Sequence, residues 1–172
     1  MMHSESRHIT LRTTPQCGGL LTDNSSRADS PLTVVLVHGA FVDASTWAGV
    51  IQRLQAAGVQ VTAAANPLRG ISIDSACMAS VIDQISGPVL AVGHSYGGAV
   101  ISNAATMANN VVGLVFVAAF APDEGERLGV VSSTSKDSLL NTALVPRRYP
   151  TGIGDETAVE FAVDPAKVHD VC

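Results

Sequence analysis

The five residues Gly93-His94-Ser95-Tyr96-Gly97 constrain the fold of this 172-residue chain more than any other segment. They follow the apolar run Val89–Val92, which predicts a strand, and they precede Gly98–Ala108, whose apolar spacing predicts a helix. In that context a Gly-x-Ser-x-Gly segment forms a sharp turn, which holds the serine in strained backbone and exposes its hydroxyl. Glycine is required at both ends because a side chain there would crowd the strand against the helix. Ser95 is therefore the candidate nucleophile, and the alternative is a structural turn that happens to contain serine.

A second loop, His38-Gly39-Ala40-Phe41, follows the β-branched run Thr33–Val37. A serine nucleophile needs two backbone N–H groups directed at the oxygen on which negative charge develops. The amide of Tyr96 is one candidate donor, and the amide of Ala40 is the best-placed second donor. We expect the Phe41 side chain to line the pocket that receives the acyl group.

Three aromatic residues near these motifs are predicted to be structural. His38 adjoins the second loop and precedes the serine, so hydrogen bonding within that loop is the favoured role. His94 lies inside the turn, and its side chain is expected to point away from Ser95. Trp47 lies at helical spacing with other apolar residues, which favours a place in the core over a place in a substrate pocket.

Strand-like and helical runs alternate along the middle of the chain. The strand-like runs are Thr33–Val37, Val59–Ala65, Val89–Val92 and Val111–Ala119, and helical runs cover Trp47–Ala57, Ile73–Ile85 and Gly98–Ala108. Continuous β-branched runs are typical of strands that are covered on both faces. The alternation therefore predicts βαβ units and an α/β fold, with a parallel sheet between two layers of helices.

The pattern divides the chain into three predicted regions. Residues 1–30 are expected to form a flexible leader, with a short strand near Ile9–Arg12 as the alternative. Residues 31–122 form the core. Residues 123–172 are polar and carry three prolines, so we expect irregular or helical structure there, with Glu156–Val163 as the most helix-like segment.

Charge and composition exclude several classes of function. The net charge is −5 and no basic run is present, which argues against nucleic acid or an anionic membrane as partner. No run of about 18 apolar residues occurs, so no membrane span is predicted. The three cysteines lack CxxC spacing, which argues against a disulfide framework or a zinc site and favours a cytoplasmic location.

Three segments resemble the α/β-hydrolase superfamily: Val34–Trp47 (VVLVHGAFVDASTW), Val92–Ala99 (VGHSYGGA) and Leu114–Glu126 (LVFVAAFAPDEGE). Within it they are most similar to the small esterase group that includes plant methyl esterases and hydroxynitrile lyases. The resemblance implies a sheet of about four strands in the order 2-1-3-4, with Ser95 as nucleophile. It also implies oxyanion donors at Ala40 and Tyr96, a small-molecule ester substrate, and neither a metal nor an organic cofactor.

The other two members of a catalytic triad have only weak candidates. The family order is serine, then acid, then histidine, and the one histidine after Ser95 is His169. No strand is predicted before His169, and its segment is typical of a surface or cap helix, so it could act as base only if the tail folded back across the sheet. Asp123 is the best-placed acid, although a role in a turn or cap is favoured for it.

We therefore expect a truncated family member, which lacks the C-terminal strands of the sheet and ends within the start of a cap region. The strand Val111–Ala119 would then be an exposed apolar edge, available for self-association or aggregation.

Three functions remain open. The first is a serine carboxylesterase that acts through an acyl-enzyme, with the base and the acid missing from this chain. The second is a catalytically inactive remnant or ligand-binding module of the same fold. The third, ranked last, is a hydroxynitrile lyase-like enzyme that cleaves a C–C bond.

Overall fold

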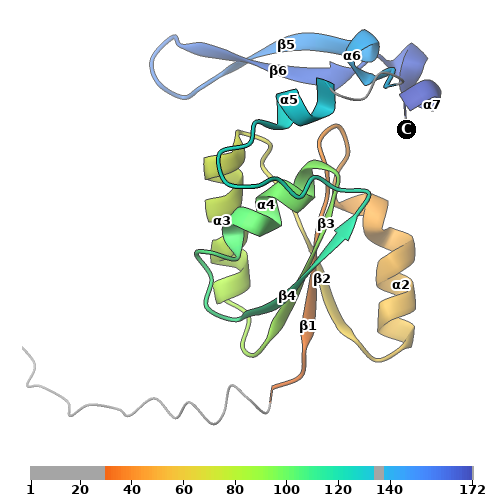
Figure 1. Ribbon diagram of the computed structural model, residues 1–172, viewed down its shortest axis with the longest axis vertical. Coiled ribbons are helices and arrows are strands. Elements are labelled where there is room, and N and C mark those ends of the chain that lie inside the picture. Colours follow the sequence, from red (N-terminus) through yellow and green to blue (C-terminus); the bar gives the residue numbers. More distant parts are fainter. Residues whose placement is uncertain (1–29, 134–137, 172) are drawn as a thin grey trace, which may run out of the picture.

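Four parallel strands form the central sheet of the computed structural model, which describes residues 30–133 and 138–171 (Figure 1). The strands are β1 (Thr33–Val37), β2 (Gln60–Ala64), β3 (Val89–His94) and β4 (Val111–Val117). Their order is β2-β1-β3-β4, which confirms the predicted fold class and strand order. The predicted leader lies outside the described residues, apart from Ser30.

Helices cover both faces of this sheet, as predicted. The 3-10 helix η1 (Ala44–Trp47) and α2 (Ala48–Ala56) lie on one face, and α3 (Ile71–Asp83) and α4 (Tyr96–Ala104) lie on the other (Figure 1). The Asp43 carboxylate caps η1 by accepting a hydrogen bond from the Ser45 amide at 2.7 Å.

Strand β1 is buried along its whole length, and its side chains alternate between two apolar cores. The core under α3 and α4 includes Val35, Val37, Met78, Ile82, Val89, Ala91, Val100 and Ile101. The core under α2 includes Val34, Leu36, Trp47 and Val92. Trp47 is only 6% exposed, which confirms its predicted place in the core.

Strand β4 is an edge of the sheet and pairs only with β3 among the described residues. Five of its apolar side chains are exposed, from 36% for Leu114 to 64% for Val112. The exposed apolar edge predicted at Val111–Ala119 is therefore present, although the strand ends at Val117. An edge of this kind presents unpaired backbone groups together with apolar side chains to another strand.

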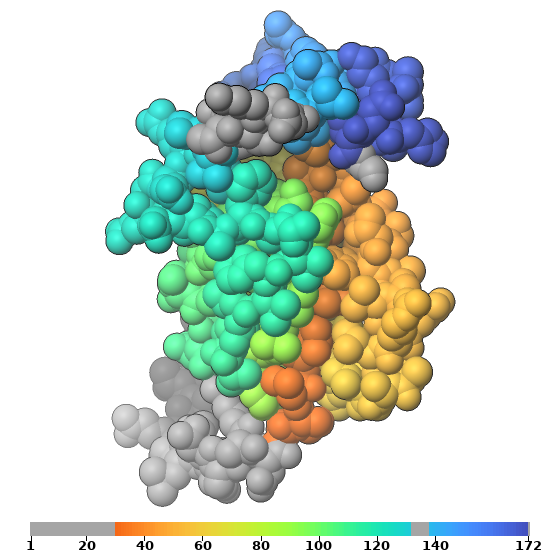
Figure 2. All heavy atoms as spheres, turned by 45° about the vertical axis from the view of Figure 1, so that its right-hand side comes forward, coloured from red at the N-terminus to blue at the C-terminus, as the bar shows by residue number. Residues whose placement is uncertain are grey.

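An antiparallel hairpin lies over the carboxyl ends of the parallel strands (Figures 1 and 2). Its strands are β5 (Leu144–Pro150) and β6 (Thr157–Val163). Short helices flank it: α5 (Leu128–Ser133), α6 (Leu140–Ala143), the 3-10 helix η2 (Pro165–Lys167) and α7 (Val168–Val171). In Figure 2 the hairpin and α7 form a layer above the core.

The hairpin corrects the prediction that residues 123–172 are irregular or helical. The most helix-like segment, Glu156–Val163, is strand from Thr157 onward, and a strand therefore does precede His169. Exposure alternates with a period of two along most of β6, and its β-branched and aromatic residues favour a strand. The prolines of β5 are tolerated because a two-stranded hairpin leaves one edge of each strand unpaired.

Candidate active site

Ser95 lies in strained backbone between the end of β3 and the start of α4. Its φ of 52° and ψ of −121° are unfavourable for a residue with a side chain. Two hydrogen bonds hold the Ser95 carbonyl, which accepts from the Gly98 amide at 3.1 Å and from the Phe120 amide at 3.0 Å. The Ser95 amide donates to the Val117 carbonyl at 3.4 Å. The turn therefore has the geometry that the sequence predicted for a serine between a strand and a helix.

Three glycines allow this close packing. A Cβ added at Gly93 would lie 2.5 Å from the Gly97 carbonyl, and one added at Gly97 would lie 2.4 Å from the Val37 carbonyl oxygen. One added at Gly98 would lie 2.4 Å from the Phe120 carbonyl oxygen. The requirement at Gly93 and Gly97 was predicted, whereas that at Gly98 was missed because it depends on the loop after β4.

The loop after β1 packs directly against Ser95. A Cβ added at Gly39 would lie 2.8 Å from Ser95 Cβ, so only glycine lets the loop approach this closely. Phe41, two residues further on, has a φ of 68° and a side chain that is 38% exposed. The structure thus brings the segment that carries the Ala40 amide to the same place as the nucleophile turn.

The two histidines of these motifs occupy structural positions. The ring of His38 is buried, and its Nε2 accepts a hydrogen bond from the Asn66 amide at 3.0 Å. Its Nδ1 therefore carries the proton and donates to the Gly39 carbonyl at 2.8 Å. The His94 ring packs edge-on against Trp47, with 6.3 Å between centroids. The predicted role of His38 within its loop is confirmed.

A buried carboxylate contacts the residue after the nucleophile. The Tyr96 hydroxyl donates to Asp74 Oδ2 at 2.8 Å, and the Arg69 amide donates to Asp74 Oδ1 at 2.8 Å. Burial raises the pKa of the Tyr96 phenol above its ordinary value, and the hydrogen bond to Asp74 raises it further. Sequence reasoning missed Asp74 because it is one of several polar residues in a helical segment, 22 positions before its partner.

A cavity of about 630 Å³ lies between the core and the hairpin. Ser95 does not line it, but the neighbouring loop and the residue after the nucleophile do. Its walls include Ala40, Phe41, Leu68, Arg69, Asp74, Tyr96, Arg147, Tyr149, Glu160, Phe161 and Val163. Arg69 crosses from the core side to the hairpin: its Nη1 pairs with Glu160 Oε2 at 2.8 Å, and its guanidinium lies 4.3 Å from the Tyr149 ring centroid.

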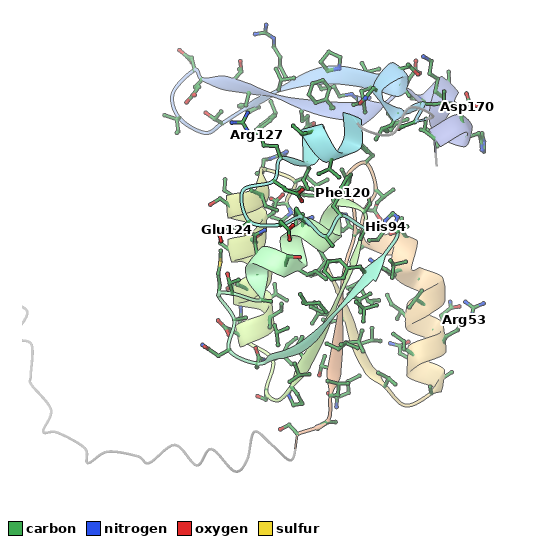
Figure 3. The ribbon with its side chains drawn as sticks, viewed as in Figure 1. Arg53, His94, Phe120, Glu124, Arg127 and Asp170 are labelled. Carbon is green, nitrogen blue, oxygen red and sulfur yellow. The ribbon has the colours of Figure 1, made fainter. Side chains whose placement is uncertain are left out.

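The structure does not bring Asp123 or His169 to Ser95. Asp123 is exposed in a turn, where its amide donates to Glu126 Oε2 at 2.8 Å, and it lines a second cavity beside Glu124 and Arg127 (Figure 3). His169 is exposed on α7. Within residues 30–133 and 138–171, no hydrogen bond links the Ser95 hydroxyl to either side chain. Their catalytic roles stay predictions.

The described part of the chain holds neither a metal-binding cluster nor a membrane-spanning helix. No group of three or more His, Cys, Asp or Glu residues in it is arranged to hold a metal ion. None of its helices has the length and apolar character needed to cross a membrane. The predicted cytoplasmic location stays a prediction.

A comparison with known protein families identifies the family of this chain. A model of the alpha/beta hydrolase family matches residues 34–170. The chain belongs to the alpha/beta hydrolase family. The match confirms the resemblance drawn from the sequence, and it extends from β1 to α7, well beyond the two motifs that flank Ser95. A comparison with curated proteins gave no match.

Several solved protein structures are similar to this chain. An extracellular alpha/beta-hydrolase from a Paenibacillus species, described as a structural and functional homologue of tobacco salicylic acid binding protein 2, is 25% identical. It has a TM-score of 0.52 over 60% of this chain and 49% of its own. Polyneuridine aldehyde esterase is 24% identical, with a TM-score of 0.62 over 78% of this chain and 58% of its own. Tomato methylketone synthase I, solved with 2-tridecanone, is 21% identical, with a TM-score of 0.62 over 80% and 58%. This chain thus spans about half to three-fifths of their length, and the last two similarities show the shared fold.

Proposed function

We propose that this chain provides the nucleophile and the oxyanion hole for the hydrolysis of small carboxylic esters through an acyl-enzyme. The backbone of Ser95 carries the proposal, because a φ of 52° at a non-glycine residue is retained where the surrounding structure enforces it. Here the enforcing contacts are the hydrogen bonds to the Ser95 carbonyl and the Gly39 backbone against the Ser95 side chain.

The proposed reaction has two steps. Ser95 Oγ attacks the ester carbonyl carbon and gives up its proton, while the amides of Ala40 and Tyr96 donate to the oxygen that becomes negative. The C–O bond then breaks, and the alcohol leaves with that proton. Water adds to the acyl-enzyme and releases the acid and Ser95. In this scheme a histidine accepts the proton from Ser95 and passes it to the alcohol, and this histidine would be His169 or one that a partner provides.

The cavity beside the Ala40 and Tyr96 amides supports a small and largely apolar substrate. Its volume of about 630 Å³ is in the range of ordinary ligand pockets. Phe41, Leu68 and Val163 contribute apolar walls. The names of similar structures, an esterase and a pyrethroid hydrolase from Sphingobium faniae, are consistent with ester substrates of this kind.

The proposal is tested with a fluorophosphonate probe, which phosphonylates an activated serine. We expect labelling of the parent chain and none of Ser95→Ala. Ser102→Ala is the matched control, because Ser102 lies on the same helix with its hydroxyl bonded to the Gly98 carbonyl at 2.9 Å. His169→Ala then shows whether that histidine supplies the base. The absence of labelling in folded parent protein would refute the proposal for this chain.

One observation favours a second function, a ligand-binding module without turnover. Among the described residues the Ser95 hydroxyl has no hydrogen bond to a histidine, and loss of the base from a serine triad costs on the order of 10⁶ in kcat. A module of this kind would bind a fatty ketone such as 2-tridecanone, the ligand of the similar methylketone synthase, without reacting with the probe. Calorimetric titration with 2-tridecanone tests this second function: heat of binding from a protein that the probe does not label would favour a binding module.

A further inference from the structure

Asp74 is a fully buried carboxylate, with none of its surface exposed. Burial of a charged group is costly unless hydrogen bonds compensate it. Asp74 has two such bonds, both of 2.8 Å, and their donors come from different parts of the cavity. The Tyr96 hydroxyl belongs to the first residue of α4, and the Arg69 amide belongs to the loop before α3.

We propose that Asp74 is a positioning residue that holds the nucleophile turn through the side chain of Tyr96. Tyr96 follows Ser95 directly, so a bond that fixes Tyr96 also limits how far the strained Ser95 backbone can relax. The hydrogen bonds to the Ser95 carbonyl restrain one side of the turn, and Asp74 restrains the other. The inference rests on the proposed function in one respect: it treats the Tyr96 amide as an oxyanion donor.

The second bond of Asp74 extends the restraint to the loop that carries Arg69. Arg69 stands between two residues with positive φ, Leu68 at 56° and Gly70 at 114°, so its loop is not held by regular structure. The bond from its amide to Asp74 fixes the point from which the guanidinium reaches Glu160 on the hairpin. One carboxylate thus positions both the turn and the residue that contacts the hairpin.

A purely structural role makes a different prediction. Asp74 lies in the first turn of α3, where a carboxylate also interacts favourably with the helix dipole. If that were its whole contribution, its loss would weaken the fold evenly and leave the turn no more mobile than β1. The neighbouring Ser75 provides the comparison, because its buried hydroxyl donates to the Val100 carbonyl at 3.3 Å, further along α4 than the turn.

Amide hydrogen exchange of the 172-residue protein tests the proposal without needing activity. The reporters are the amides of Gly98 and Phe120, which bond to the Ser95 carbonyl, and the reference is the amide of Leu36 in β1. In Asp74→Asn, which can accept from only one of the two donors, we expect the reporters to exchange about tenfold faster relative to the reference.

Tyr96→Phe removes only the hydroxyl, and it is expected to give the same selective increase. If Asp74→Asn does not fold, Tyr96→Phe alone tests whether the bond to Asp74 restrains the turn. Ser75→Ala is expected to change the reporters and the reference by the same factor. The proposal would be overturned if the ratio of reporter to reference exchange rates in Tyr96→Phe equalled that ratio in Ser75→Ala.

Kinetics of probe labelling provide a second readout. If the parent protein is labelled, Tyr96→Phe is expected to lower the maximal labelling rate about tenfold with little change in the concentration for half-maximal rate. If the parent is not labelled, the proposed function fails, while hydrogen exchange still decides the role of Asp74.

Discussion

Replacement of Gly97 by alanine is expected to destabilise the fold strongly. The new Cβ would lie 2.4 Å from the Val37 carbonyl oxygen, which is 1.0 Å short of the 3.4 Å at which ordinary contact begins (3.4 − 2.4). The His38 carbonyl oxygen would be 2.9 Å away. Both atoms are backbone, so no side-chain rotation relieves the overlap and α4 must move away from β1. Overpacking costs about 1–3 kcal/mol, and we expect the upper value, about 3 kcal/mol, for Gly97→Ala.

Urea unfolding measures this loss, followed by the fluorescence of Trp47, the single tryptophan and a buried core residue. Gly129→Ala in α5 is the control, because a Cβ there meets nothing within 4 Å. Alanine is favoured over glycine in helices by up to about 1 kcal/mol, so this variant should be at least as stable as the parent. Equal unfolding midpoints for the two variants would refute the packing argument.

Three further changes test other features. The pKa of Tyr96 is raised in the folded state, so its contribution to stability is complete below the ordinary tyrosine pKa of 10.0 and is lost as the pH rises above it. Tyr96→Phe should therefore reduce the fall of the melting temperature at alkaline pH. If the melting temperature of the variant falls as steeply with pH as that of the parent, Tyr96 is not the group responsible. Arg69→Met removes the contacts to Glu160 and Tyr149, and it should accelerate proteolysis within the hairpin. It should change the free energy of unfolding by less than about 1 kcal/mol, since exposed ion pairs contribute little. Equal rates of proteolysis in variant and parent would argue that these contacts do not hold the hairpin. Val112→Lys should weaken self-association of the 172-residue chain through β4, and an unaltered sedimentation profile at high concentration would exclude that edge.

The alternation of strands and helices could be predicted from sequence because each element has its own local pattern. Val34–Val37 is continuously apolar since β1 is buried on both faces, and glycines mark the close contacts around Ser95. The strand order followed from resemblance to a known family, not from periodicity. The nucleophile turn was predictable because its strand, serine and helix are contiguous in the chain.

The cavity could not be predicted in the same way, because its walls come from distant segments. Asp74 and Tyr96 are 22 residues apart, and Arg69 and Glu160 are 91 residues apart. No local pattern reports such contacts. The hairpin was missed for another reason: exposure in β6 alternates from Thr157 to Ala162, but the exposed positions include the apolar Val159 and Phe161, so no polar–apolar alternation marks this strand in the sequence.

The backbone strain of Phe41, Leu68 and Ser95 limits how this protein can be improved by engineering. All three have positive φ, and all three lie at or beside the cavity. Phe41 and Leu68 line it, and Ser95 packs against Gly39 in the loop after β1 that also carries Phe41. Each such residue costs about 1–3 kcal/mol, which the rest of the fold must outweigh. Glycine at 41 or 68 would relieve that cost, so a selection for heat resistance alone would favour those substitutions. It would thereby remove the side chains that shape the cavity, which makes thermostability a poor guide to useful variants here.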